Sequence, residues 1–174
     1  MKSEVKLVKP SIEYKDSYLA FYNEWIESGE DIVPWVVERN PTNFEDMLLW
    51  LSESEVEDNL PENYVPHSTY WLINEEKKVV AAVNIRHRLN ERLRIAGGHI
   101  GYGVCPSQRR KGYATRLLNL ALQKTKELSI EEVLVCCDKE NIASERTIIN
   151  NGGKFKNEIV EPNGNVVRRF WIKS

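Results

Sequence analysis

The sequence predicts a single α/β or α+β domain over residues 1–174. Segments with helical spacing of apolar residues alternate with strand-like runs, and no linker, repeat or low-complexity segment interrupts them. A chain of 174 residues can bury one sizeable core without disulfide or metal support. Its hydrophobic fraction of 41% and charged fraction of 29% are ordinary for a soluble globular protein.

Four segments carry the apolar periodicity of amphipathic helices. They span approximately residues 16–28, 44–51, 114–128 and 142–150. The second helix is expected to begin at the capping-box pattern of residues 42–45, and the fourth at Asn141. Glycines end two of the helices, with Gly29 after the first and the pair Gly152-Gly153 after the fourth.

Seven runs have the composition of β-strands. They cover residues 5–8, 69–73, 79–86, 98–104, 132–137, 155–160 and 166–172. The polar turns 74–78 and 162–164 predict two hairpins, whereas residues 89–94 are predicted as a turn or an exposed connection. Gly101 and Gly103 are unusual inside a strand, and they indicate a bulge or the close approach of another backbone or a ligand.

The distribution of charge is more informative than its sum. A formal net charge of -2 argues against nucleic-acid binding by bulk electrostatics. No Asp or Glu occurs between Arg92 and Lys126, where basic residues recur, so this block could attract a polyanionic ligand. Acidic clusters lie at residues 27–31 and 53–58, and clusters of either sign also fit a solvated surface.

The cysteines and histidines predict neither a disulfide framework nor a metal site. Cys136 and Cys137 are adjacent in an apolar run and Cys105 is alone, which suits buried thiols in a reducing cytosol. The three histidines show no ligand spacing with them. No signal peptide or run of membrane length is evident, so a cytoplasmic location without membrane partners is expected.

Residues 101–116 form the stretch around which the rest of the sequence is organised. A strand ends at Pro106, a cationic loop follows, and the next helix has small residues and no acid in its first turn. A helix N-terminus exposes unpaired amides and the positive end of the macrodipole, so this loop suits an anion such as phosphate. The sequence lacks a Walker loop, and Gly101 and Gly103 lack the third glycine of the dinucleotide fingerprint.

Two motifs resemble those of the GCN5-related N-acetyltransferase (GNAT) superfamily. Residues 109–114, Arg-Arg-Lys-Gly-Tyr-Ala, are similar to the family's Arg/Gln-x-x-Gly-x-Gly/Ala loop, and Asn141 with the later Gly152-Gly153 is similar to its Asn-led helix. The order of the predicted elements agrees as well. The resemblance implies an α/β (α+β) domain with a mixed, mostly antiparallel central sheet flanked by helices. It also implies direct acetyl transfer from acetyl-CoA, without a metal, to a primary amine of a small molecule or peptide.

The resemblance implies roles position by position. Backbone groups of Tyr102, Gly103 and Val104 would meet the pantetheine arm and the acetyl carbonyl, where a strand amide would stabilise the oxyanion. Asn141 would bond the pantetheine side, and Ser144 would either contact the cofactor thiol or satisfy its own helix backbone. The pyrophosphate would be held by Arg109, Arg110, Lys111, Gly112, Tyr113, Ala114 and Thr115.

The sequence departs from the family at the positions that complete the proton transfers. Ile148 replaces the tyrosine that protonates the leaving thiolate in many relatives, and the place of a strand glutamate base falls at Gly98. His99 is the nearest titratable candidate, and an ordinary pKa of about 6.5 suits a catalytic base. The alternatives are that His99 packs in the sheet and that a water chain removes the proton.

The acceptor is predicted only in outline. The acidic N-terminal half hints at a cationic acceptor such as a polyamine, an aminoglycoside-like molecule or a peptide amine. The missing tyrosine keeps open a non-catalytic sensor that binds CoA or acyl-CoA, and the same loop could serve a nucleotide-binding protein. Acyl-chain preference and oligomeric state, a homodimer included, are left open.

Overall fold

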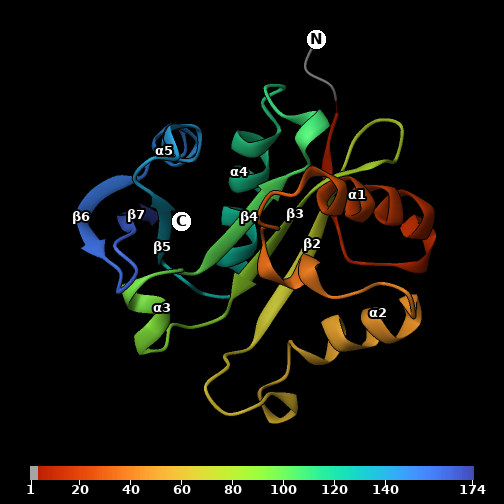
Figure 1. Cartoon of the computed structure of the whole chain (residues 1–174). Helices are drawn as coiled ribbons and strands as arrows, with labels where there is room; N and C mark the ends of the chain where they lie inside the picture. The colour runs from red at the N-terminus through yellow and green to blue at the C-terminus, as the bar shows by residue number, and fades with distance from the viewer. Residues whose placement is uncertain (1–3) are drawn as a thin grey trace.

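Seven strands form two antiparallel sheets in the computed structural model, which describes residues 4–174 (Figure 1). The first sheet has the order β1-β2-β3-β4, with strands Lys6–Val8, His67–Ile73, Val79–Arg86 and Ile100–Val104. The second has the order β5-β7-β6, with strands Glu132–Asp138, Val166–Lys173 and Lys154–Val160. Both predicted hairpins are present, as the pairs β2-β3 and β6-β7.

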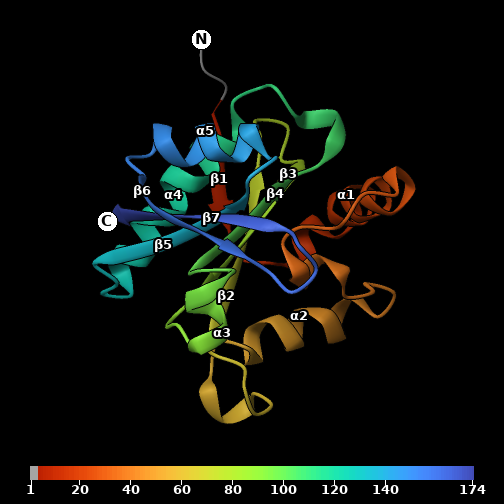
Figure 2. The ribbon, with the colours of Figure 1, turned by 60° about the vertical axis from the view of Figure 1, so that its left-hand side comes forward.

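Five α-helices cover these sheets within the described residues. They are α1 Lys15–Ser28, α2 Phe44–Glu53, α3 Glu91–Ile95, α4 Tyr113–Glu127 and α5 Ile142–Asn150. Four 3-10 turns accompany them, η1 Ile12–Tyr14, η2 Trp35–Glu38, η3 Glu57–Asn59 and η4 Pro106–Gln108. Helices α1 and α2 lie on one side of the four-stranded sheet and α4 on the other, while α5 lies beside the second sheet (Figures 1 and 2).

Two hydrophobic clusters fill the two faces of the four-stranded sheet. Strand β3 contributes to both because its side chains alternate between the faces. Val83 and Ile85 belong to the cluster beneath α4, and Ala82 belongs to the cluster beneath α1 and α2. In the second cluster the rings of Trp71 and Tyr18 stack with their centroids 4.1 Å apart. The four-stranded sheet is therefore packed on both faces, and this packing holds its edge strand β4, which borders the site.

Side-chain caps explain two differences from the predicted helices. Helix α2 begins at Phe44, as predicted, but its N-cap is Asn43, whose Oδ1 accepts the Asp46 amide at 3.1 Å, whereas the capping-box pattern of residues 42–45 would place the cap at Thr42. Residues 89–94, predicted as a connection, contain most of the short helix α3. Asn90 caps that helix by accepting the Leu93 amide at 2.9 Å.

The predicted central sheet is divided where β4 and β5 meet. One bridge joins Gly98 to Val135, and Gly98 has a left-handed φ of 67°, so β4 begins only at Ile100. Beyond that bridge no ladder joins the two sheets within residues 4–174. The predicted α/β (α+β) class with mostly antiparallel strands and flanking helices is confirmed, and the strands are distributed over two sheets. The outer edge of β4 is left open.

Candidate functional site

The loop between β4 and α4 carries a row of unpaired backbone amides. Arg110 and the N-cap Gly112 have left-handed φ values of 62° and 80°, which turn successive amides toward the same side. Among the described residues, the amides of residues 110–112 donate no backbone hydrogen bond. The next three amides belong to the first turn of α4 and have no partner within the helix. Together with the helix dipole they make an anion site.

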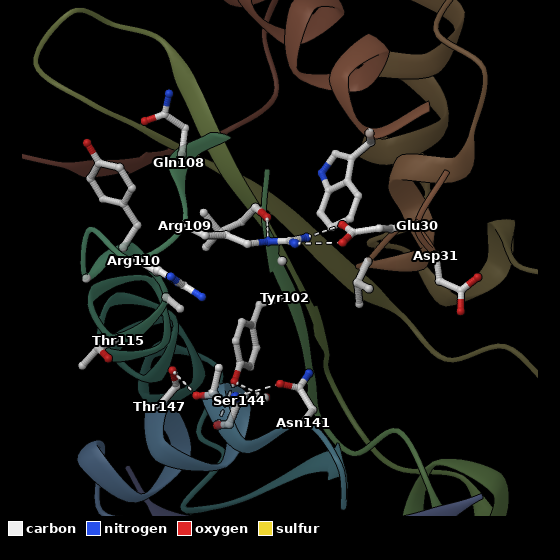
Figure 3. Close-up of a pocket in the computed structure, with 18 of the residues that line it drawn as sticks. Glu30, Asp31, Tyr102, Gln108, Arg109, Arg110, Thr115, Asn141, Ser144 and Thr147 are labelled. Carbon is white, nitrogen blue, oxygen red and sulfur yellow. Dashed lines mark hydrogen bonds and ion pairs between the residues drawn. The ribbon is translucent and has the colours of Figure 1, made fainter. Parts of the chain in front are cut away.

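A cavity of about 930 Å³ opens beside this loop (Figure 3). Its walls come from the end of α1 and the loop after it, the edge of β4, and the first turns of α4 and α5. The predicted cofactor residues that line it are Tyr102, Gly103, Val104, Arg109, Arg110, Gly112, Tyr113, Ala114, Thr115, Asn141 and Ser144. Lys111 is not in the wall, and its Nζ donates to Gln108 Oε1 at 3.0 Å.

The edge of β4 offers its own backbone groups to the cavity. Strands β3 and β4 pair in antiparallel register with Ala82 opposite Gly103, and the Cys105 amide donates to the Val80 carbonyl. Because antiparallel hydrogen bonds alternate along a strand, the amides of Tyr102 and Val104 face away from β3. That direction is the open edge beside β5, where donors could reach a ligand carbonyl.

A glycine is required at position 103 because the backbone of the loop after α1 lies directly against β4 there. A Cβ at this position would lie far inside van der Waals contact with the Val33 carbonyl oxygen. The loop after α1 can therefore rest directly on the strand, and Trp25 and Val33 line the cavity beside Gly103. The predicted close approach of a backbone at Gly103 is confirmed.

Arg109 spans the cavity instead of staying with the anion loop. Its Nη1 and Nη2 donate to the two carboxylate oxygens of Glu30 at 3.1 and 2.7 Å, and its Nε lies 3.3 Å from the Val104 carbonyl oxygen (Figure 3). The guanidinium also lies 5.3 Å from the centroid of the Trp25 ring. The hydrogen bonds from Arg109 hold the pKa of the Glu30 carboxyl below its ordinary value. This pair links the acidic segment after α1 to the basic loop, a contact that the sequence did not indicate.

Two hydroxyl groups meet at the start of α5. Tyr102 Oη lies 2.8 Å from Ser144 Oγ, and both residues line the cavity (Figure 3). Burial raises the pKa of Tyr102 to about 12, so its hydroxyl keeps its proton at neutral pH. Asn141 caps α5 by accepting the Ser144 amide at 3.0 Å, which leaves its Nδ2 available. The sequence had suggested only a backbone role for Tyr102.

His99 lies outside the walls of the cavity. It is 6% exposed, and its Nδ1 accepts the Leu134 amide at 2.9 Å. Burial lowers the pKa of His99 to about 4, so the ring is neutral with its proton on Nε2. This bond joins the start of β4 to β5, and it favours the packing alternative over the base role suggested from the sequence.

The two positions that lack the family's catalytic side chains are structural. A Cβ at Gly98 would clash with the carbonyl oxygen of Leu134, so this backbone leaves no room for a glutamate. Ile148 is fully buried in the cluster beneath α4. In this chain, neither residue therefore presents a proton-transfer group to the cavity.

Comparison with known proteins decides the family. A family model described as an acetyltransferase (GNAT) domain matches residues 6–154. The chain belongs to the GNAT acetyltransferase family. A search of curated proteins found no match.

Solved structures share the fold of this GNAT domain at low identity. The ribosomal-protein-S5-alanine acetyltransferase of Vibrio fischeri superposes with a TM-score of 0.68 and 17% identity, covering 99% of this chain and 93% of its own. Microcin C7 self-immunity acetyltransferase MccE, in complex with acetyl-CoA and AMP, gives 0.65 and 18%, with 98% and 93% covered. The dodecameric spermidine N-acetyltransferase of Vibrio cholerae gives 0.63 and 17%, with 99% and 94% covered. At identities below 25%, these superpositions show the shared fold alone.

Within residues 4–174, no group of three or more His, Cys, Asp and Glu side chains could hold a metal ion. No helix in that range is both long and apolar enough to cross a membrane.

Proposed function

We propose that this GNAT protein transfers an acetyl group from acetyl-CoA directly to a primary amine of a small molecule or peptide. One observation carries the proposal: the unpaired amides at the start of α4 open onto the same cavity as the free edge of β4. A cofactor with a pyrophosphate at one end and a thioester at the other needs those two features at two ends of one cleft.

Different parts of the cavity wall match the chemical groups of different parts of acetyl-CoA. The amides of residues 110–115 would hold the pyrophosphate, helped by the dipole of α4 and the charge of Arg110. The outer-edge groups of Tyr102 and Val104 would pair with the pantetheine amides, and Asn141 Nδ2 would donate to the same arm. Bound there, acetyl-CoA supplies the acetyl group as an activated thioester.

Groups at the edge of β4 would stabilise the transition state and supply a proton to the leaving group. An outward amide of β4 donates to the carbonyl oxygen that gains negative charge during attack, a preorganised dipole of the kind that dominates acyl transfer. The pair Tyr102–Ser144 holds a hydroxyl proton next to that edge, where the leaving sulfur needs one. Since His99 is neutral and outside the wall, the amine proton leaves through water.

The experiment separates cofactor binding from turnover. Ala114→Glu places a carboxylate in the first turn of α4, where it suits the helix dipole but repels a phosphate. Asn119→Glu adds the same charge to an exposed site of the same helix. We expect acetyl-CoA to stabilise the wild type and Asn119→Glu in a thermal-shift assay, and the stabilisation to disappear in Ala114→Glu.

Thiol release with a panel of amines then tests the reaction. Release that depends on an amine supports the transferase. Tight binding without release from any amine would instead support the alternative, a CoA or acyl-CoA sensor, to which the buried Ile148 lends weight. Stabilisation by ATP but not by desulfo-CoA would point to a nucleotide-binding protein.

A further inference from the structure

A second cavity of about 470 Å³ lies over the face of the sheet that α1 and α2 cover. Its walls include Trp35 from η2, His67 from β2, Asn84 and Arg86 from β3, Arg92 from α3, and Glu161 before β7. None of its lining residues lines the first cavity. No residue of β4 lines the second cavity, and the link between the two cavities runs along one face of the sheet. Asn84 in the second cavity pairs with Gly101, and Gly103, two residues further along the same face of β4, lines the first.

Two arginines give this second cavity a positive charge that the chain does not neutralise. Within residues 4–174, neither Arg86 nor Arg92 forms an ion pair. Arg86 Nη1 donates to the carbonyl oxygens of Gly97 and Gly98, each at 3.3 Å. Burial and the nearby Arg92 lower the pKa of Arg86 to about 10, which still leaves it charged at neutral pH. A buried charge is costly without a counter-ion.

The one carboxylate in the wall does not supply that counter-ion. Glu161 Oε2 accepts from Asn165 Nδ2 at 2.9 Å, in the turn between β6 and β7. It makes no ion pair with either arginine. The net positive charge of the wall is therefore free for an anion from outside the chain.

Asn84 adds a buried acceptor without a donor. Its side chain is fixed because Nδ2 donates to His67 Nδ1 at 2.8 Å and lies 3.1 Å from Thr69 Oγ1. Asn84 is fully buried, and its Oδ1 has no hydrogen-bond partner among the described residues. An unsatisfied buried oxygen in a cavity wall is suited to a ligand N–H.

Aromatic rings complete the wall. The Trp35 ring lies 6.0 Å from Tyr64 and 5.4 Å from His67, centroid to centroid. Burial lowers the pKa of His67 to about 4, so this ring is neutral. The cavity thus combines a flat apolar side with a cationic side and one carbonyl acceptor.

We propose that the second cavity binds the acceptor, and that this acceptor is an amine that also carries a carboxylate or a phosphate. Arg86 and Arg92 bind the anionic group, and Asn84 Oδ1 accepts an N–H of the amine beside Gly101. The assignment rests on the proposed acetyl transfer, and it makes Arg92 and Asn84 specificity and positioning residues for it.

Three carboxylates of the acidic segments that hinted at a polycationic acceptor are paired with basic side chains elsewhere. Glu55 pairs with Lys9, and Glu57 pairs with Arg88. Glu30 is engaged by Arg109 in the first cavity. None of these carboxylates lines the second cavity.

Matched pairs of amines test the assignment in steady-state thiol release. Phenylalanine is compared with phenylethylamine, which lacks the carboxylate, and O-phosphoethanolamine with ethanolamine, which lacks the phosphate; spermidine is the polycation. Arg92→Gln removes one cavity charge at an exposed position, and Arg94→Gln removes the same charge from the same helix outside the cavity. We expect Arg92→Gln to raise KM about tenfold for an anionic probe but not for its neutral partner. Arg94→Gln should match the wild type.

Equal effects of Arg92→Gln on both members of each pair, or a preference for spermidine, would overturn the assignment while leaving acetyl transfer intact. The better anionic probe distinguishes a carboxylate from a phosphate. If no amine is acetylated, the transferase proposal fails, and calorimetric titration with phenylalanine and with O-phosphoethanolamine still decides the cavity. Weaker binding by Arg92→Gln than by Arg94→Gln supports the anion site, and binding of neither probe by the wild type refutes it.

Discussion

Tyr102 Oη and Ser144 Oγ are 2.8 Å apart, which places a hydroxyl pair from β4 and α5 on the wall of the large cavity. The two residues are far apart in the sequence and meet because the first turn of α5 lies beside the open edge of β4 (Figure 3). In the proposed reaction the pair would supply the proton, because Ile148, one turn further along α5, is buried in the core.

Removal of the tyrosine hydroxyl should slow the reaction without weakening the cofactor. Tyr102→Phe keeps the ring but leaves Ser144 without this partner, so we expect kcat to fall roughly 100- to 10,000-fold, as for loss of an acid catalyst. The dissociation constant for acetyl-CoA should stay within about twofold, because the backbone groups of β4 are unchanged. Steady-state kinetics and calorimetry measure the two quantities.

The matched control is Tyr22→Phe, which removes a hydroxyl from α1 outside the cavity. Because burial raises the pKa of Tyr102 to about 12, the wild-type kcat should not fall between pH 7 and 10 through ionisation of this group. A Tyr102→Phe enzyme with unchanged kcat would show that the pair is structural.

Glu30 should weaken cofactor binding in the wild type. Its carboxylate holds Arg109 with two hydrogen bonds and adds negative charge to the cavity that would receive the pyrophosphate. In Glu30→Gln we expect acetyl-CoA to bind several-fold more tightly at low salt, and the gain to shrink at high salt because charges are screened. Calorimetric titration at two ionic strengths measures this.

Glu27→Gln makes the same change of charge at an exposed position of α1 outside the cavity, and its affinity should equal that of the wild type. Weaker binding by Glu30→Gln would mean that the ion pair holds the cavity in its binding shape.

Much of the fold was predictable because its signals are local. The caps at Asn43 and Asn141, the hairpin turns and the apolar stripe of α4 all act within a few residues. The residues around Gly112 could be placed at one anion site for the same reason, since a helix N-terminus is a local structure.

The rest depends on contacts between distant segments. The pairing of Glu30 with Arg109, the meeting of Tyr102 with Ser144, and the bridge at Gly98 that divides the sheet have no sequence periodicity behind them. The second cavity was missed because Asn84 lies in a strand that otherwise reads as continuous core. A polar residue inside such a run is the one signal that could have found it.

His99 should govern the acid stability of the fold rather than the pH dependence of catalysis. Its pKa is about 4 when folded and near 6.5 when unfolded, so the unfolded chain binds more protons between these values. The stability that neutral His99 contributes is complete above pH 6.5 and is lost as the pH falls toward 4. His67, with a folded pKa also of about 4, adds to the same loss.

His99→Gln separates the two roles, because the amide oxygen of glutamine can still accept the Leu134 amide without titrating. Urea unfolding at pH 7 and pH 5 should show a smaller loss of free energy in the variant than in the wild type. The pH profile of kcat/KM should keep its wild-type shape. If the acidic limb of the kcat/KM profile disappears in the variant, His99 is the catalytic base after all.

Gly103 should tolerate no side chain, because the Val33 carbonyl occupies the space that a Cβ would take. Gly103→Ala must push the loop after α1 away from β4, and we expect it to lower the free energy of unfolding by about 1–3 kcal/mol, as overpacking does. The same displacement moves Val33 and Trp25, which line the cavity, so acetyl-CoA should bind more weakly. Gly152→Ala is the control for a glycine in open space, although its φ of 87° adds backbone strain of its own. Chemical denaturation and calorimetry measure both effects, and an unchanged affinity in Gly103→Ala would show that the loop after α1 does not shape the cofactor site.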